Sequence, residues 1–95
     1  MVRNTEIVIA GAARTPIGAF NGAFATLAAH ELGAVAIAEA VKRAKIAPDD
    51  VGEVIMGQIL TAGVGMGPAR QAAMAAGIPK ERTAFSVNQL CGSGL

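Results

Sequence analysis

Apolar residues occur along this chain in two ways, as short continuous runs and as longer stretches with helical spacing. The segment from Glu6 to Ala13 is almost wholly apolar and contains β-branched residues, as in strands buried on both faces. Residues 28–45 have amphipathic spacing, with apolar positions at Leu32, Val35, Ala36, Ala40 and Val41. The pattern therefore predicts a strand over residues 6–13 and a helix over residues 28–45.

The second half of the chain repeats this alternation. Residues 53–60 predict a second strand, and the glycine-rich residues 61–67 predict a loop. Pro68 suits the first turn of a helix, and Gly77 suits its end. A third strand is expected from Ala84 to Asn88, with another helix beginning at Cys91. The resulting β-α-β-α-β order indicates an α/β fold with a mostly parallel sheet.

Composition places limits on the kind of protein. The chain is 53% hydrophobic but only 3% aromatic, so Ala and Gly carry much of its apolar character. Such a composition suits close packing of helices on a sheet inside a larger body, and we expect these 95 residues to be part of a bigger domain. With 8 basic and 7 acidic residues, the charge argues against a nucleic-acid partner or an anionic membrane surface.

Targeting signals and cysteine content indicate the compartment. No apolar run approaches the roughly 20 residues of a membrane span. The start of the chain resembles neither a secretory signal nor a transit segment. A single cysteine cannot form an internal disulfide, so we expect a reducing, cytoplasmic location.

Cys91 is the strongest candidate for chemistry. It comes just after the third predicted strand, and in parallel sheets functional residues gather beyond the carboxyl ends of the strands. Gly92, Ser93 and Gly94 follow it and allow a tight turn. A thiol at a helix start faces free N–H groups, which lower its pKa and favour the nucleophilic thiolate. The alternative is a small buried hydrophobe, but such a residue needs no glycine-rich turn.

The other candidates carry weaker signals. His30, the only histidine, is expected to cap or pack a helix, and Met56, Met66 and Met74 are expected to pack. Residues 63–67 lack the Lys-Ser/Thr ending of a phosphate-binding loop. No cluster of His, Cys and Asp supports a metal site. Three acidic residues are expected to face solvent: Asp49, Asp50 and Glu53.

The segment NQLCGSGL at residues 88–95 resembles the acylation motif of thiolases. Three further segments, at the matching spacing, also resemble thiolase sequences: AARTPIG at 12–18, EVIMGQ at 53–58 and PARQAA at 68–73. Within that family the chain resembles especially the biosynthetic acetyl-CoA acetyltransferases. The resemblance implies the layered αβαβα fold, of which residues 1–95 would form the amino-terminal part of the first half-domain, supplying its first β-α-β-α-β unit.

The resemblance also implies a reaction. Cys91 would take an acyl group from acyl-CoA, with its own backbone N–H in the oxyanion hole. Two acetyl-CoA would then give acetoacetyl-CoA and CoA, or the reverse thiolysis would occur. Coenzyme A thioesters would be substrates, with no prosthetic group. The activating histidine, the second cysteine and the coenzyme A contacts would lie outside residues 1–95. A β-ketoacyl synthase-like condensing enzyme is the alternative, and the isolated chain is expected to be inactive.

The sequence also predicts an oligomer, and at one point it differs from the usual thiolase pattern. Strand order places the strand from Ala84 to Asn88 at a sheet edge, where an open, uncharged edge would be a liability. Thiolases are dimers or tetramers, so a homo-oligomer with this strand at its interface is expected. The family often has Gln-Asn where this chain has Met66 and Gly67, which affects any contact made by that asparagine.

Overall fold

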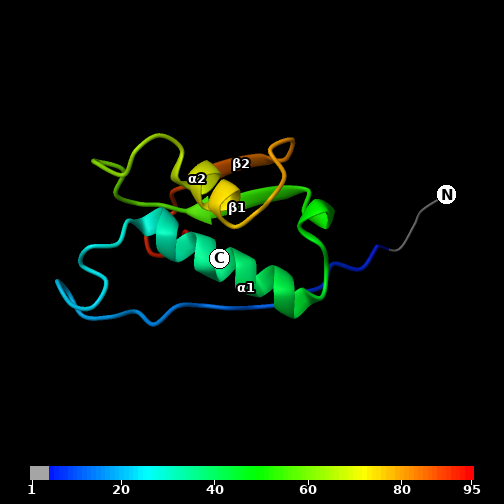
Figure 1. The fold of residues 1–95 in the computed structure, drawn as a ribbon, viewed down its shortest axis with the longest axis horizontal. Helices are drawn as coiled ribbons and strands as arrows, with labels where there is room; N and C mark the ends of the chain where they lie inside the picture. Colours follow the sequence, from blue (N-terminus) through cyan, green and yellow to red (C-terminus); the bar gives the residue numbers. More distant parts are fainter. Residues whose placement is uncertain (1–4) are drawn as a thin grey trace.

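The computed structural model describes residues 5–95, and in it two helices pack on a small parallel sheet (Figure 1). The elements in chain order are α1 (Ala29–Ala44), the 3-10 turn η1 (Pro48–Asp50), β1 (Glu53–Gly57), α2 (Pro68–Ala75) and β2 (Thr83–Val87). The helices predicted over residues 28–45 and between Pro68 and Gly77 are therefore confirmed, with ends within a residue or two of those expected from the sequence.

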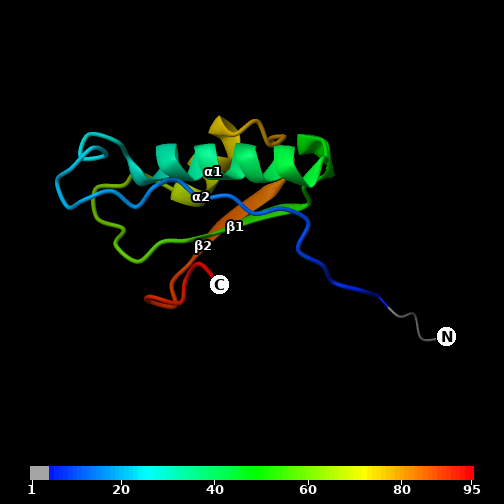
Figure 2. The ribbon, with the colours of Figure 1, turned by 90° about the horizontal axis from the view of Figure 1, so that it is seen from below.

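The sheet has the parallel arrangement that the alternation predicts. β1 and β2 pair in register from Glu53 opposite Thr83 to Gly57 opposite Val87. The chain crosses from one strand to the next through α2, and Figure 2 shows both helices on the same side of the sheet. The carboxyl ends of the two strands consequently lie side by side, next to the turn that carries Cys91.

The core is made of small side chains. The residues buried below a tenth of their surface are Val54, Ala69, Ala72, Ala73 and Ile78. Small residues also let the helices approach closely, because a Cβ on Gly33 of α1 would lie 3.3 Å from the Ala72 Cβ of α2. The expected role of Ala and Gly in close helix packing is confirmed.

The strand expected over residues 6–13 is absent, and that prediction was wrong. The segment is extended but pairs with no strand among residues 5–95, and Ile7 and Ile9 are 96% and 91% exposed. It is held instead by α1, where Arg43 Nη1 donates to the Ala12 carbonyl at 2.9 Å. Gly11 also lies against α1, since a Cβ there would be 2.8 Å from the Ala40 carbonyl oxygen. An apolar run becomes a strand only where a neighbouring strand supplies hydrogen bonds.

Two side chains expected to pack are exposed. Val35, placed on the apolar stripe of the helix, is 61% exposed, and Met66 is 91% exposed. The face of α1 that meets the core carries Val41, as predicted, and Ile37, which the predicted stripe did not include. Three other expectations are confirmed, because Met56 and Met74 do pack against the core and Asp49, Asp50 and Glu53 are exposed.

The strands differ from the predicted ones at their ends. β1 stops at Gly57, three residues before the predicted end at Leu60. Gln58 still donates its backbone N–H to Val87 at 3.0 Å, but its side-chain Nε2 donates to the Leu60 carbonyl at 2.6 Å. This side-chain contact accompanies the bend that ends the strand.

The loop between β1 and α2 has a defined path. Gly63 and Gly65 adopt left-handed backbone angles, with φ of 71° and 83°. Gln71 Nε2 reaches back from α2 and donates to the Met66 carbonyl at 2.8 Å.

None of the described helices is long and apolar enough to cross a membrane.

Candidate active site

Cys91 lies on a sequence of tight turns that follows β2. Figure 2 shows this segment, the red end of the chain, on the side of the sheet away from the two helices. Gly92 N donates to the Gln89 carbonyl at 3.1 Å, and Ser93 N donates to the Leu90 carbonyl at 3.0 Å. Leu95 N donates to the Gly92 carbonyl at 3.1 Å, so all three bonds span three residues. An α-helix starting at Cys91 would instead join Leu95 N to the Cys91 carbonyl. The predicted helix start is therefore wrong for the described residues.

The sharpest point of this turn is at Leu90. Its φ of 53° lies in the left-handed region, whereas Gly92 and Gly94 have no positive φ. The Asn88 side chain supports Leu90, because its Oδ1 accepts the Leu90 N–H at 3.0 Å. The glycines after the cysteine were expected to provide the turn, but the unusual conformation is at the residue before it.

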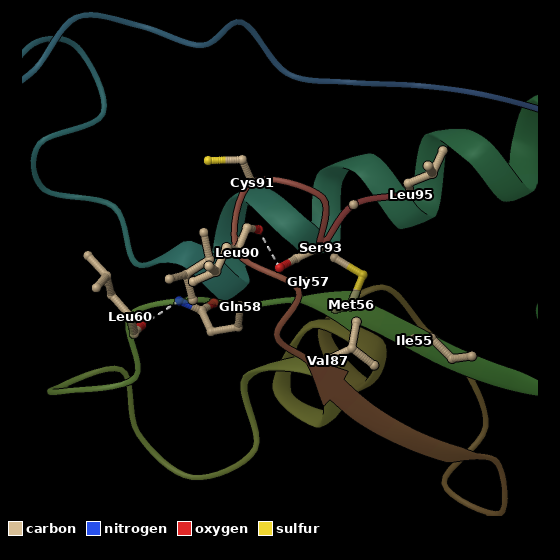
Figure 3. A pocket seen from close by; sticks show the side chains of 12 residues that line it. Ile55, Met56, Gly57, Gln58, Leu60, Val87, Leu90, Cys91, Ser93 and Leu95 are labelled. Carbon is tan, nitrogen blue, oxygen red and sulfur yellow. Dashed lines mark hydrogen bonds between the residues drawn. The ribbon is translucent and has the colours of Figure 1, made fainter.

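The Cys91 thiol is accessible. The residue is exposed, and in Figure 3 its sulfur points away from the Ser93 side chain. The Cys91 backbone N–H donates no hydrogen bond within residues 5–95. An accessible thiol and an N–H without a partner in the described chain are two of the groups that acyl transfer by a thiol enzyme uses.

An open, largely apolar pocket lies beside this turn, with a volume of about 820 Å³. Its walls come from the ends of both strands and from the Cys91 turn, as Figure 3 shows. The apolar side chains that line it are Ile55, Met56, Ile59, Leu60, Val87, Leu90 and Leu95. The nucleophile candidate thus borders a concave, apolar surface of the kind that small-molecule sites use.

Comparison with known proteins shows which family this chain belongs to. Residues 7–95 match the thiolase N-terminal domain family. This chain belongs to the thiolase family. An acetyl-CoA acetyltransferase of Rhizobium meliloti is 61% identical over 92 residues, which are 97% of this chain and 23% of that protein. A Clostridioides difficile acetyl-CoA acetyltransferase is 54% identical over 95% of this chain and 84% of its own length.

The fold comparison agrees. The crystal structure of the Acat5 thiolase from Ascaris suum in complex with coenzyme A has a TM-score of 0.87 and 39% identity, over 90% of this chain and 22% of that one. The α/β, thiolase-like fold is therefore shown. The thiolase chain described here spans less than a quarter of the length of the Rhizobium and Ascaris proteins that it matches.

His30 does not join Cys91. It lies in the first turn of α1 and lines a separate cavity of about 100 Å³, together with Ser86 and Ala72. Its Nδ1 is buried without a hydrogen-bond partner among the described residues. His30 therefore borders a cavity other than the one beside Cys91. Within residues 5–95, no three His, Cys, Asp or Glu side chains gather as metal ligands.

The sequence analysis did not predict the contacts that three residues make in the site, namely Gly57, Asn88 and Ser93. Ser93 Oγ accepts the Gln89 N–H at 2.8 Å and donates to the Leu90 carbonyl at 2.6 Å. Gly57, the last residue of β1, lies against Ser93, because a Cβ at position 57 would be 2.7 Å from the Ser93 Cβ. One signal was available, since an Asn two residues before Leu90 is typical of an Asx turn.

Proposed function

We propose that the complete protein containing this chain transfers acyl groups between coenzyme A thioesters, with Cys91 as the nucleophile. The observation that carries this proposal is the exposed Cys91 at the end of two parallel strands, with its own N–H unpaired in the described chain. Membership of the thiolase family and relatives named acetyl-CoA acetyltransferase support the substrate class. The preferred reaction is condensation of two acetyl-CoA to acetoacetyl-CoA and CoA, or its reverse.

In the first step the Cys91 thiolate attacks the thioester carbonyl of acyl-CoA. The carbonyl oxygen gains negative charge, and the Cys91 N–H is free to donate a hydrogen bond to it. The bond between the carbonyl carbon and the coenzyme A sulfur then breaks, and that sulfur leaves as a thiolate that takes up a proton. The product is an acyl group held on Cys91 Sγ.

In the second step the methyl carbon of acetyl-CoA loses a proton to a base outside residues 1–95. The resulting carbanion attacks the acyl carbon on Cys91, forming a carbon–carbon bond. The bond from that carbon to Cys91 Sγ breaks, and the thiolate is restored. Two partial reactions through a covalent intermediate replace one difficult condensation.

The proposal includes the place of this chain in the protein. We infer that residues 1–95 form the amino-terminal part of the first thiolase half-domain, as the family match over residues 7–95 supports. The base and the coenzyme A contacts would come from other parts of the enzyme, so the isolated chain should be inactive. The alternative, a β-ketoacyl synthase-like enzyme, would use acyl groups on a carrier protein in place of acetyl-CoA.

Substitution of Cys91 tests the proposed chemistry. In the complete protein, Cys91→Ala should abolish condensation of acetyl-CoA, and Cys91→Ser should be severely impaired because a hydroxyl stays protonated near neutral pH. Iodoacetamide should inactivate the wild type, and acetyl-CoA should slow this inactivation. Normal turnover by Cys91→Ala would rule out the assignment, and preference for carrier-protein thioesters would favour the synthase alternative.

We also infer a homo-oligomer, a dimer or tetramer, with β2 at the interface. β2 pairs only with β1 in the described chain, so its other edge is open, and an apolar, uncharged strand edge favours pairing with a second copy. Val87→Asp should dissociate the oligomer in size-exclusion chromatography and reduce activity, because Cys91 follows closely. Lys42→Glu, at an exposed, charged position of α1, is the control. A fully active Val87→Asp oligomer would exclude this interface.

A further inference from the structure

Hydrogen bonds hold the peptide unit between Leu90 and Cys91 at its carbonyl oxygen. The Leu90 carbonyl oxygen accepts two hydrogen bonds from Ser93, at 3.0 Å from its backbone N and at 2.6 Å from its Oγ. The N–H of the same peptide unit belongs to Cys91. Because a trans peptide is planar, with its C=O and N–H pointing in opposite directions, fixing the carbonyl also fixes the N–H.

The Ser93 hydroxyl therefore does more than close a turn. It accepts the Gln89 N–H at 2.8 Å while donating to the Leu90 carbonyl, and so joins the two residues that precede the cysteine. Leu90 needs such support, because its left-handed φ of 53° is unfavourable for a residue with a branched side chain. Without the hydroxyl, the Leu90 carbonyl keeps only the bond from the Ser93 backbone N–H, and the Leu90–Cys91 peptide is held less tightly.

Gly57 allows the turn around Cys91 to pack closely against the end of β1. A Cβ at position 57 would lie 2.7 Å from the Ser93 Cβ and 2.8 Å from both the Ser93 carbonyl carbon and oxygen. Two of these atoms are backbone, so no side-chain rotation would relieve the clash. Figure 3 shows Ser93 directly beside Gly57 at the end of β1, with the Cys91 sulfur directed the other way. Only glycine allows the turn to sit on the strand at this distance.

We propose that Ser93 and Gly57 are positioning residues that aim the Cys91 backbone N–H at the site of acyl transfer. Ser93 orients the Leu90–Cys91 peptide, and Gly57 seats Ser93 against the end of β1. This inference rests on the proposed function, since it assigns these residues a task within acyl transfer at Cys91. It separates two properties of Cys91, namely the reactivity of its sulfur and the stabilisation of the oxyanion by its N–H.

The two properties respond to different reagents. Iodoacetamide alkylates the sulfur by direct displacement of iodide, and no oxyanion forms. Acetyl-CoA acylates the same sulfur through a tetrahedral oxyanion. Loss of one aligned oxyanion donor typically slows acyl transfer by about 100- to 1,000-fold, and misalignment should cost less than complete loss. A residue that only aims the N–H should therefore affect acylation and leave alkylation nearly unchanged.

The test compares both rates in the complete protein carrying Ser93→Ala. Acylation of Cys91 by acetyl-CoA should slow by about 10- to 100-fold, with alkylation by iodoacetamide within a factor of about two of wild type. Thr15→Val is the matched control, because it removes a hydroxyl that donates to the Pro16 carbonyl at 3.1 Å, in the segment before α1. It should leave both rates unchanged. The melting temperature of each variant is measured alongside.

Gly57→Ala provides a second route to the same result. It keeps the Ser93 hydroxyl but displaces the turn, so acylation should again slow more than alkylation. If Ser93→Ala does not fold, Gly57→Ala decides the question. Equal slowing of both reactions, or no slowing of acylation, would overturn the inference. A wild type that alkylates at Cys91 but is never acylated there would instead overturn the proposed function.

Discussion

At the scale of single residues, Gly67 shows how backbone conformation restricts the sequence just before α2. It precedes the helix with φ of 54° and ψ of 67°, in the left-handed region, and its carbonyl accepts the Gln71 N–H at 2.9 Å. There is room for a side chain, since a Cβ would lie 3.4 Å from the nearest atom, the Arg70 Cβ. The restriction is therefore one of backbone angle, and Asn is the residue that tolerates this region best after Gly.

Substitution of Gly67 tests whether its left-handed backbone angle restricts the residue at this position. Gly67→Asn should change the free energy of unfolding of the complete protein by less than about 0.5 kcal/mol, because Asn accepts left-handed angles. Gly67→Val should lower it by about 2 kcal/mol or more, because a β-branched residue is strained there. Urea denaturation followed by circular dichroism measures both. Equal stability of the Asn and Val variants would show that the left-handed angle does not constrain this position.

At the scale of elements, two arginines join segments that the sheet does not connect. Arg70 of α2 donates from Nη1 to the Arg82 carbonyl at 2.8 Å and from Nη2 to the Lys80 carbonyl at 2.9 Å. Arg82 in turn donates from Nη2 to the Asp49 carbonyl of η1 at 2.6 Å. A guanidinium can hold two carbonyls at once because its donors form a rigid fork. These contacts fix the connector that leads from α2 into β2.

Removal of the Arg70 fork should loosen this connection. Arg70→Met should lower the free energy of unfolding by about 2 kcal/mol, since it deletes two charged hydrogen bonds and removes the donor to the part-buried Arg82 carbonyl. Arg70→Lys should lie between Met and wild type, because one ammonium cannot reproduce the fork. Lys42→Met, at an exposed position of α1, is the control and should change stability by less than about 0.5 kcal/mol. An Arg70→Met variant as stable as the control would contradict this role.

The elements also differ in how far the sequence predicts them. α1 and α2 could be predicted because helices depend on local spacing and on end signals such as Pro68 and Gly77. The segment from Glu6 to Ala13 could not, because a strand depends on a distant partner that local sequence does not reveal. Cys91 was identifiable from its neighbours, but the contact between Ser93 and Gly57 was not. Their importance arises from a contact between positions that are 36 residues apart in sequence.

At the scale of the whole molecule, the described chain leaves much apolar surface uncovered. Only Val54 and Ile78 among its buried core residues are larger than alanine. Ile7, Ile9 and Phe20 are each more than nine-tenths exposed. The radius of gyration of 14.5 Å exceeds the value of about 12 Å that is typical of a compact domain of this length. We expect such a surface to be covered by other parts of the complete protein.

The isolated 95-residue chain should therefore fold poorly. We expect a broad, weakly cooperative thermal transition, binding of hydrophobic dyes and aggregation, because little apolar surface is buried and the sheet edges are open. The complete protein should unfold cooperatively under the same conditions. Differential scanning calorimetry and size-exclusion chromatography measure this. A soluble 95-residue monomer with a sharp thermal transition would disprove the expectation.

The central claim, that Cys91 carries the acyl group, is tested most directly by trapping the intermediate. The complete protein is mixed with acetyl-CoA, quenched in acid within one turnover, digested and analysed by mass spectrometry. One acetyl group should appear on the peptide containing Cys91, form at least as fast as turnover, and disappear when coenzyme A is added. Cys91→Ala should carry no acetyl group. Turnover without acetyl-Cys91, or a kinetically competent acetyl group on another residue, would contradict the account.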